Sequence, residues 1–249
     1  MIHKWLSRMQ LSNTSLVVDG ISKEQHSFLR RHQLHKWMIY VLRILLLLGF
    51  LTLWEWTSRS GIIDSFVFSS PSKIGICFLG MVRDGSIFHH LGATLYETVF
   101  SFLLVTLFSI LIAVLLWFSP KASEVLEPYL VVLNSLPKSA LAPLLIVWLG
   151  ATRTTIIVAG MSVAIFGSIL SLYTSFTTTD PGKMKLIYTL GGHRRHALVK
   201  VVLPSAVPSI ISNMKVNIGL CLVGVIIGEF LAAREGLGYL IIYSSQVFL

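Results

Sequence analysis

The residue patterns that enzymes use for chemistry are missing from this sequence. It has no Gly-x-x-x-x-Gly-Lys-Ser/Thr loop to cradle nucleotide phosphates, no Gly-x-Ser-x-Gly elbow to present a nucleophile and no His-Glu-x-x-His pair to hold zinc. The two cysteines, Cys77 and Cys221, are far apart in the chain and have no CxxC or histidine partner at metal spacing. We therefore predict no catalytic residue, no metal site and no cofactor.

A basic loop between two apolar stretches, residues 177–207, holds the densest group of candidate functional residues. Asp180-Pro181-Gly182 is typical of a turn, and Gly191-Gly192 interrupts apolar positions at helical spacing. We expect two short helices that meet at this glycine bend and end at Leu203-Pro204 before the next apolar stretch. Periodicity alone is equally compatible with a solvated basic loop or an interfacial helix that binds anionic lipid.

A few polar side chains lie inside apolar stretches. Carboxylates at membrane depth are costly and are functional hypotheses by default, so Glu229 is a candidate for gating or for a structural ion pair. The alternative is an interfacial carboxylate near Arg234, and Glu97 has a similar alternative. Asn134 and Lys138 lie in the proline-broken stretch. They could line a polar pathway, or the break could be a kink that serves packing alone. The same two alternatives apply to Asn213, Lys215 and Asn217.

The composition explains where such residues must sit. Hydrophobic residues make up 54% of the 249 residues and charged residues only 12%, with a mean hydropathy of +0.78, which excludes an ordinary soluble domain. A membrane helix needs about 20 apolar residues, whereas a barrel strand needs about 10. We predict an all-α, polytopic bundle of transmembrane helices with five spans: Met38–Thr57, Leu91–Phe118, Tyr129–Leu149 interrupted by Pro137 and Pro143, Thr154–Phe176 and Pro208–Leu231.

Loop charges predict the orientation of these spans. With the N-terminus in the cytoplasm, the cytoplasmic segments hold twelve Lys and Arg residues and the outer segments hold five. We therefore expect a basic cytoplasmic leader, residues 1–37, followed by a membrane domain, residues 38–249. The formal net charge of +9 does not indicate nucleic-acid binding, because no aromatic residues alternate with the basic ones to form a groove.

Four short sequence stretches match the motifs of a known family and occur in the order that the family has them. The chain has Ser70-Pro71-Ser72-Lys73-Ile74, Leu136 to Leu144, Gly228 to Ala233, and Gly191 followed after nine residues by Val201-Val202-Leu203-Pro204. From about Phe68 onwards it resembles the binding-protein-dependent transport permeases, the membrane subunits of ABC importers, and among them the nitrate, sulfonate, taurine and thiamine-precursor branch. The resemblance implies a type I importer permease fold. The sixth span usual in the family is expected to be missing after the short apolar stretch Tyr239–Leu249.

The resemblance also implies how the loop would work. In the family this loop docks on an ATPase subunit as a coupling helix. The positions that match the family's loop are Lys185, Leu186, Ile187, Gly191, Gly192, Arg194, Arg195, Val201, Leu203 and Pro204. Lys185, Leu186 and Ile187 stand where the family has Glu-Ala-Ala, so the polar contacts of the docking differ here. Gly191 would permit a close backbone approach, and Pro204 would stiffen the connection to the next span.

The implied partners are ABC ATPase subunits, an extracytoplasmic substrate-binding protein, a second permease subunit in a homodimer, and membrane lipid. The implied location is the bacterial inner membrane, and the implied cargo is a small solute such as a sulfonate, nitrate, taurine or a pyrimidine. Two other classes compete with this reading. A membrane-embedded enzyme would need catalytic groups that converge at one depth, and none do so in the sequence. A membrane scaffold or lipid-binding anchor would use the basic leader instead of the loop.

Overall fold

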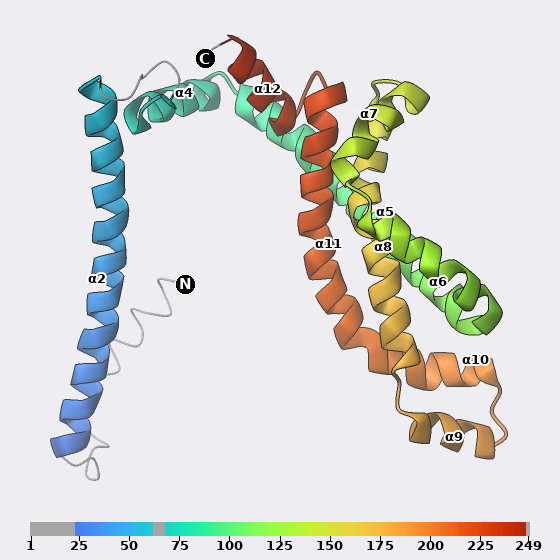
Figure 1. Cartoon of the computed structure of the whole chain (residues 1–249). Coiled ribbons are helices and arrows are strands. Elements are labelled where there is room, and N and C mark those ends of the chain that lie inside the picture. The colour runs from blue at the N-terminus through green and yellow to red at the C-terminus, as the bar shows by residue number, and fades with distance from the viewer. Residues whose placement is uncertain (1–22, 62–67, 248–249) are drawn as a thin grey trace. The chain divides into compact units, whose positions relative to one another are not determined.

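The computed structural model describes residues 23–61 and 68–247, in which the regular elements are all helices (Figure 1). The chain forms two compact units, Met1–Cys77 and Phe78–Leu249. The first contains α2 (Lys23–Arg59) and the beginning of α4 (Pro71–Arg83), and α4 continues into the second unit. The remaining helices belong to the second unit. They are α5 (Ser86–Phe118), α6 (Pro120–Ser135), α7 (Lys138–Leu149), α8 (Arg153–Thr177), α9 (Pro181–Thr189), α10 (Arg194–Ala197), the π-helical segment η2 (Leu198–Val202), α11 (Leu203–Ala232) and α12 (Leu237–Val247).

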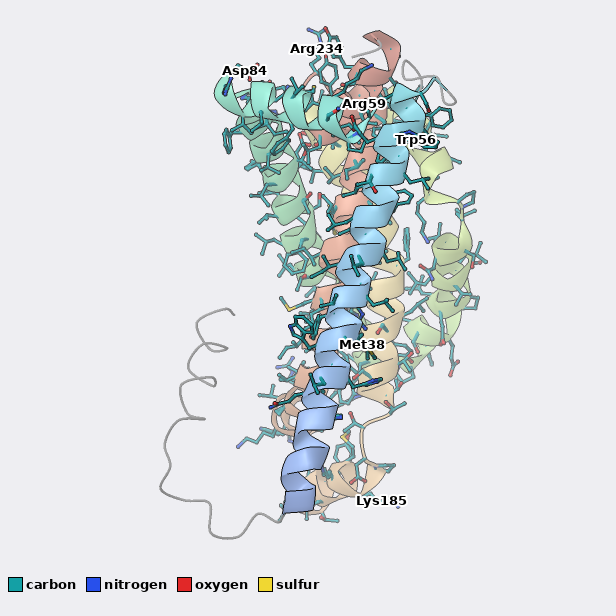
Figure 2. All side chains as sticks on the ribbon, turned by 90° about the vertical axis from the view of Figure 1, so that its left-hand side faces the viewer. Met38, Trp56, Arg59, Asp84, Lys185 and Arg234 are labelled. Atoms are coloured by element: carbon teal, nitrogen blue, oxygen red, sulfur yellow. The ribbon has the colours of Figure 1, made fainter. Side chains whose placement is uncertain are left out.

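The first unit is dominated by α2, whose residues His32–Arg59 are long and apolar enough to cross a membrane. The predicted first span, Met38–Thr57, lies inside this helix, which begins already at Lys23. Trp56 and Arg59 lie at one end of α2, with Met38 farther along it (Figure 2). Near that end Glu55 accepts hydrogen bonds from Arg59 Nε at 2.6 Å and from the Ser72 hydroxyl at 2.6 Å. Residues 1–22 of the predicted leader lie outside the described residues.

The second unit is organised around α5, α8 and α11, each of which is long and apolar enough to span a membrane. These helices confirm the predicted second, fourth and fifth spans, with boundaries that extend by a few residues. Helix α8 packs against both α5 and α11. At the start of α8 the Thr152 hydroxyl accepts the Thr155 N–H, which is a typical N-cap.

The predicted third span, Tyr129–Leu149, is interrupted at Pro137, as expected. The chain forms α6 and α7, which are bent by 104° at the break, so the pair is either a broken span or a re-entrant loop. The physical reason is Pro137, because a residue before proline avoids the helical region and Leu136 is extended, with φ −64° and ψ 142°. Pro143 does not interrupt α7, contrary to the prediction. With the pair counted as one span, the described residues contain five candidate spans, and otherwise four.

Helices α8 and α11 approach each other closely through glycines. A Cβ atom built on Gly224 would lie 2.8 Å from the Cα atom of Gly160, and one built on Gly228 would lie 3.2 Å from the Cα atom of Ile156. Between membrane helices, where lipid and side chains are equally apolar, such small residues allow the backbones to come together and gain van der Waals contact. This contact fixes α11 against α8 along much of its length.

We expect Gly224→Val to destabilise the bundle by about 1–3 kcal/mol, because the added side chain overpacks the contact with Gly160. The measurement is thermal unfolding of the purified chain in detergent. The matched control is Gly219→Val on the same helix, since nothing lies within 4 Å of a Cβ atom at Gly219. Equal unfolding temperatures for the two variants would show that the close approach does not support the fold.

Candidate functional site: the basic loop and the buried carboxylate at the opposite end

The first half of the basic loop is the helix α9, which has a sequence signal at each end. Asp180 accepts the Gly182 N–H at 2.8 Å and caps its start, with Pro181 in the first turn. At its other end Gly192 N–H donates to the Ile187 carbonyl at 2.9 Å and Gly191 N–H donates to the Tyr188 carbonyl at 3.0 Å. These two bonds form a Schellman motif. Of the two glycines, Gly191 takes the left-handed conformation, with φ +78°, and Gly192 makes the close approach.

The second half of the loop does not end before the next span. Helix α10, η2 and α11 form one continuous helical stretch, Arg194–Ala232, so the predicted stop at Leu203-Pro204 is wrong. Pro204 has no N–H to donate and would clash with the Lys200 carbonyl in a regular α-helix. The π-helical turn at Leu198–Val202 lies where this conflict arises, and the Leu203 N–H bonds to the Leu198 carbonyl. The chain therefore passes the proline without a break.

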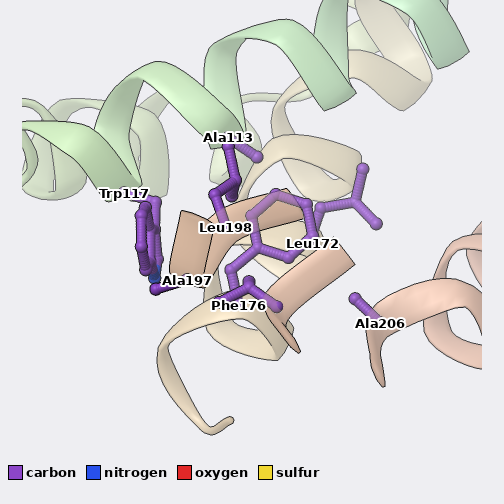
Figure 3. Close-up of a cluster of buried hydrophobic side chains, with 8 residues drawn as sticks. Ala113, Trp117, Leu172, Phe176, Ala197, Leu198 and Ala206 are labelled. Atoms are coloured by element: carbon purple, nitrogen blue, oxygen red, sulfur yellow. The ribbon is translucent and has the colours of Figure 1, made fainter. Parts of the chain in front are cut away.

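Arg194 fastens the loop to the bundle. Its guanidinium lies 5.1 Å from the centre of the Trp117 ring and donates a hydrogen bond of 2.7 Å to the Trp117 carbonyl. This carbonyl belongs to the last turn of α5, where a cation is also favoured by the helix dipole. Below it, Trp117, Leu172 and Phe176 pack around Ala197 and Leu198 in a buried apolar cluster (Figure 3). The Arg194 side chain thus contacts the end of α5 while it stays largely exposed, and the resemblance places this residue on the docking loop.

The other predicted loop residues divide between the bundle and the surface. Ile187 and Leu203 pack against the apolar cluster. Lys185, Gly191, Arg195 and Pro204 are exposed, and Gly192 and Val201 are half-buried. Leu186 and Leu190, four residues apart on α9, are 58% and 76% exposed. One face of α9 packs against the apolar cluster. The two leucines form an apolar surface that no described residue of the second unit covers.

Asp84 and Arg234 lie at the end of the second unit opposite Lys185 (Figure 2), and Glu229 belongs to the last turn of α11, just before Arg234. The Glu229 side chain is only 1% exposed, so the alternative of an interfacial carboxylate near Arg234 is wrong. Its two oxygens accept hydrogen bonds from the Thr94 hydroxyl and the Gly238 N–H, each at 2.7 Å. Thr94 in turn accepts the Leu237 N–H at 2.8 Å. Glu229 and Thr94 together cap the start of α12.

This capping arrangement requires glycine at two positions. A Cβ atom at Gly236 would lie 2.3 Å from the Glu229 carboxylate, and φ at Gly236 is +107°. A Cβ atom at Gly238 would lie 2.6 Å from the Ile226 carbonyl. The Gly236 N–H also donates to His90 Nδ1 at 3.1 Å, and Tyr239 stacks on that imidazole. Sequence reasoning missed Thr94 and His90, because nothing in their spacing indicates contact with residues so far along the chain.

A second carboxyl group, Glu97, is buried on α5 near Glu229, with a side chain only 3% exposed. Its Oε2 atom has no hydrogen-bond partner among the described residues. It lines a pocket with Arg153 and Glu235, which form an ion pair of 2.7 Å at the surface. Outside the spans, the Ser86 N–H and hydroxyl donate to Asp84 and lower the pKa of its carboxyl. Over the described part of the chain, no three His, Cys, Asp or Glu residues are placed to hold a metal ion.

The predicted pathway residues Asn134 and Lys138 lie together at the break between α6 and α7. Lys138 Nζ donates to the carbonyl oxygen of Asn134 and lies 3.4 Å from its side-chain oxygen. The ammonium group thus satisfies carbonyls at the end of α6, which the proline break leaves without helical partners. The Asn134 side chain faces Gly167 of α8, where a Cβ atom would lie 3.2 Å from its oxygen.

We expect Arg194→Ala to loosen the loop while the bundle stays folded, because the variant loses the stacking on Trp117 and the bond to its carbonyl. Amide exchange in α9 and α10 rises by about fivefold, which corresponds to about 1 kcal/mol of local stability. Hydrogen exchange with mass spectrometry measures this. Arg195→Ala is the matched control, since Arg195 is exposed like Arg194 but the contact with Trp117 belongs to Arg194 alone. If exchange in the loop rises equally in both variants, Arg194 does not fasten it.

We expect Glu229→Gln to release α12, because an amide nitrogen would then face either the Gly238 N–H or the Thr94 hydroxyl, which both donate. An unsatisfied buried group of this kind costs about 1–3 kcal/mol. The readout is faster amide exchange over Leu237–Val247. Glu235→Gln serves as control, because the exposed Arg153–Glu235 pair contributes about 0–1 kcal/mol. Unchanged exchange in Glu229→Gln would disprove the capping role.

Comparison with known proteins agrees with this architecture. Residues 105–248 match the family described as "Binding-protein-dependent transport system inner membrane component". A probable ABC transporter permease protein of Haemophilus influenzae is 30% identical over 83% of this chain and 84% of its own length. A putative aliphatic sulfonates transport permease of Bacillus subtilis is 25% identical over 79% of this chain and 71% of its own length. A formylaminopyrimidine transport permease of Halalkalibacterium halodurans is 27% identical over 78% and 77%, respectively.

The family match covers more than half of the chain, including the basic loop and the Glu229 region, and the Haemophilus relative extends the likeness towards the N-terminus. The resemblance to the sulfonate, taurine and thiamine-precursor permeases, predicted from four short stretches, is confirmed by these relatives and by a taurine transport system permease of Escherichia coli. This chain is a multi-pass helical membrane protein that belongs to the binding-protein-dependent transport system inner membrane component family.

Proposed function

We propose that this chain is the membrane-spanning subunit of an ATP-driven importer of a small solute. In this proposal two copies pair in the bacterial inner membrane, and an extracytoplasmic binding protein delivers the solute. Each copy rests on a separate ABC ATPase subunit, which hydrolyses ATP, since this sequence has no phosphate-binding loop. Relatives whose names refer to sulfonates, taurine or formylaminopyrimidine support a small polar solute as cargo.

The observation that carries the proposal is the uncovered apolar face of α9. Leu186 and the C-cap residue Leu190 are largely exposed on a short helix that is capped at both ends and packs against the bundle through Ile187. A short amphipathic helix of this kind is suited to a hydrophobic groove on a partner protein. We propose that the loop 177–207 is the coupling segment and that Leu186 and Leu190 enter the ATPase groove, with Lys185 and Arg195 at its rim.

The continuous helical stretch Arg194–Ala232 supports a mechanical role for the loop. A helix moves as a unit, so a displacement of α10 by the ATPase would reach α11 without being absorbed at a hinge. In this scheme Gly191 and Gly192 form the bend between the docking helix α9 and this stretch, and Val201, Leu203 and Pro204 lie in its continuous part. The bundle would then turn its cavity outward when the ATPase subunits close on ATP.

The distribution of basic residues supports the orientation of the chain. The loop carries five Lys and Arg residues and the leader, residues 1–37, carries six, which favours the cytoplasmic side for both. The opposite end of the second unit, where Glu229 and α12 lie, would then face outward. The large apolar side chains exposed on α5 and α11 would contact lipid and the second copy of the membrane domain, residues 38–249.

We expect Leu190→Asp to abolish co-purification with the cognate ATPase subunit, since a buried unpaired carboxylate opposes docking in an apolar groove. The chain and the ATPase are expressed together, solubilised and passed over an affinity column for either one. A reduction of about tenfold in bound ATPase is expected.

Ile241→Asp is the control for this experiment, because Ile241 is similarly exposed, at 55%, but lies on α12 at the opposite end of the second unit. It should retain the ATPase. Both variants must elute as folded chains on gel filtration. A Leu190→Asp chain that still binds the ATPase would contradict the assignment of α9 as the docking helix.

A further inference from the structure

A polar cleft of about 470 Å³ opens between α6, α8 and α11. Its polar side chains come from two stripes and from Asn134. On α11, Ser209, Ser212, Asn213 and Asn217 follow one another at spacings of three, one and four residues, which places them on one face of the helix. On α8, Ser168 and Ser171 face the same space. The residues on α8 and α11 lie within helices that are long and apolar enough to cross the hydrocarbon core, where polar groups are costly and are functional candidates by default.

Part of this polarity is used to hold α8 and α11 together. The side-chain amides of Asn213 and Asn217 donate to the Ser168 carbonyl at 3.2 Å and to the Ser168 hydroxyl at 2.9 Å. Such bonds between membrane helices contribute about 1 kcal/mol each. Ser168, Asn213 and Asn217 are all at least nine-tenths buried. These three residues therefore form the polar floor of the cleft.

The remaining hydrogen-bonding capacity has no partner in the fold. The side-chain oxygens of Asn213 and Asn217 accept no hydrogen bond from a described residue, and the hydroxyls of Ser171, Ser209 and Ser212 make none. A serine that only packs in a membrane helix would bond back to its own helix, as Ser205 does with the Val202 carbonyl at 2.9 Å. The cleft thus offers free donors and free acceptors side by side.

The side chains that line the cleft carry no charge. Lys138, beside Asn134, does not line the cleft, and its ammonium donates to the Asn134 carbonyl oxygen at the end of α6. Lys215 of α11 does not line it either, because it lies on the face of the helix away from Asn213 and Asn217. An anion that left water for this cleft would find hydrogen bonds but no counter-charge, and such transfers are costly. An uncharged solute with its own hydrogen-bond donors and acceptors would find partners for both in the cleft and would need no counter-charge.

We propose that this cleft is a contact site for the transported solute and that the solute is an uncharged polar molecule, such as an amide or an aminopyrimidine, and not a sulfonate or another anion. The site rests on the proposed importer function. It assigns solute contact to Ser171, Ser209 and Ser212 and to the amide oxygens of Asn213 and Asn217. It leaves Lys138 as a structural group of α6.

Two expected properties of the cleft can be tested before the solute is known. The cleft must be accessible to water, and it must admit uncharged molecules more readily than anions. The full chain, with exposed Cys77 changed to Ser and buried Cys221 retained, carries Ser212→Cys and is placed in lipid nanodiscs that expose both membrane faces. Its rate of modification is measured with hydroxyethyl methanethiosulfonate, which is neutral, and with the anionic sulfonatoethyl reagent of similar length. Each rate is divided by that of a free thiol in solution.

We expect the neutral reagent to modify Ser212→Cys about tenfold faster than the anionic one, because the anionic reagent must lose hydration to enter a cleft without a counter-charge. Ile218→Cys, on the opposite face of α11, is the control and should react slowly with both reagents. Ser171→Cys repeats the test from α8 and replaces Ser212→Cys if that variant does not fold.

Two outcomes would overturn the proposal. No reaction with either reagent would mean that the cleft is dry and serves packing alone. An equal or faster reaction with the anionic reagent would assign the cleft to anions, with Lys138 as the source of attraction. Failure of the importer function itself would show separately, as an absence of bound ATPase in a chain whose Ser212→Cys variant still discriminates between the reagents.

Discussion

The close contact of α8 with α11 is the constraint on which the rest of the second unit depends. In lipid there is no hydrophobic gain from bringing two apolar helices together, so their association relies on short backbone distances and interhelical hydrogen bonds. Gly160, Gly224 and Gly228 supply the first, and the pairing of Ser168 with Asn213 and Asn217 supplies the second. Helix α5 packs against both α8 and α11 and completes the three-helix centre.

Both candidate functional regions are built on the ends of one helical stretch. Arg194–Ala232 contains 39 residues without a break, and α10 runs in a different direction from the main part of α11 (Figure 1). At one end Arg194 joins it to Trp117 of α5, and at the other end Glu229 joins it to Thr94 of the same helix. The π-helical turn before Pro204 is what allows the stretch to stay continuous. The loop and the opposite end of the second unit are therefore joined by one unbroken helical stretch.

The elements that the sequence predicted well are those with strong local signals. Apolar runs of about 20 residues identified α2, α5, α8 and α11, and Pro137 identified the break between α6 and α7. Asp180 and the Gly191-Gly192 pair identified the two ends of α9. Pro204 was misread as a stop, because a proline's effect on a helix depends on whether the preceding turn can widen. Pro143 was misread for the same kind of reason, since α7 continues through it.

Glu229 shows most clearly where sequence reasoning ends. Its carboxylate was recognisable as a costly group at membrane depth, yet its bonds go to Thr94, 135 residues away, and to the backbone of Gly238. The sequence by itself determined that this is a helical membrane protein with a basic loop and a known family pattern, because those properties follow from hydropathy, charge and short-range capping. Only the tertiary structure decided that Arg194 contacts Trp117 of α5, that Glu229 caps α12 and that serines and asparagines from separate helices share one cleft. Those relations depend on which faces of distant helices meet, and local periodicity does not specify such pairings.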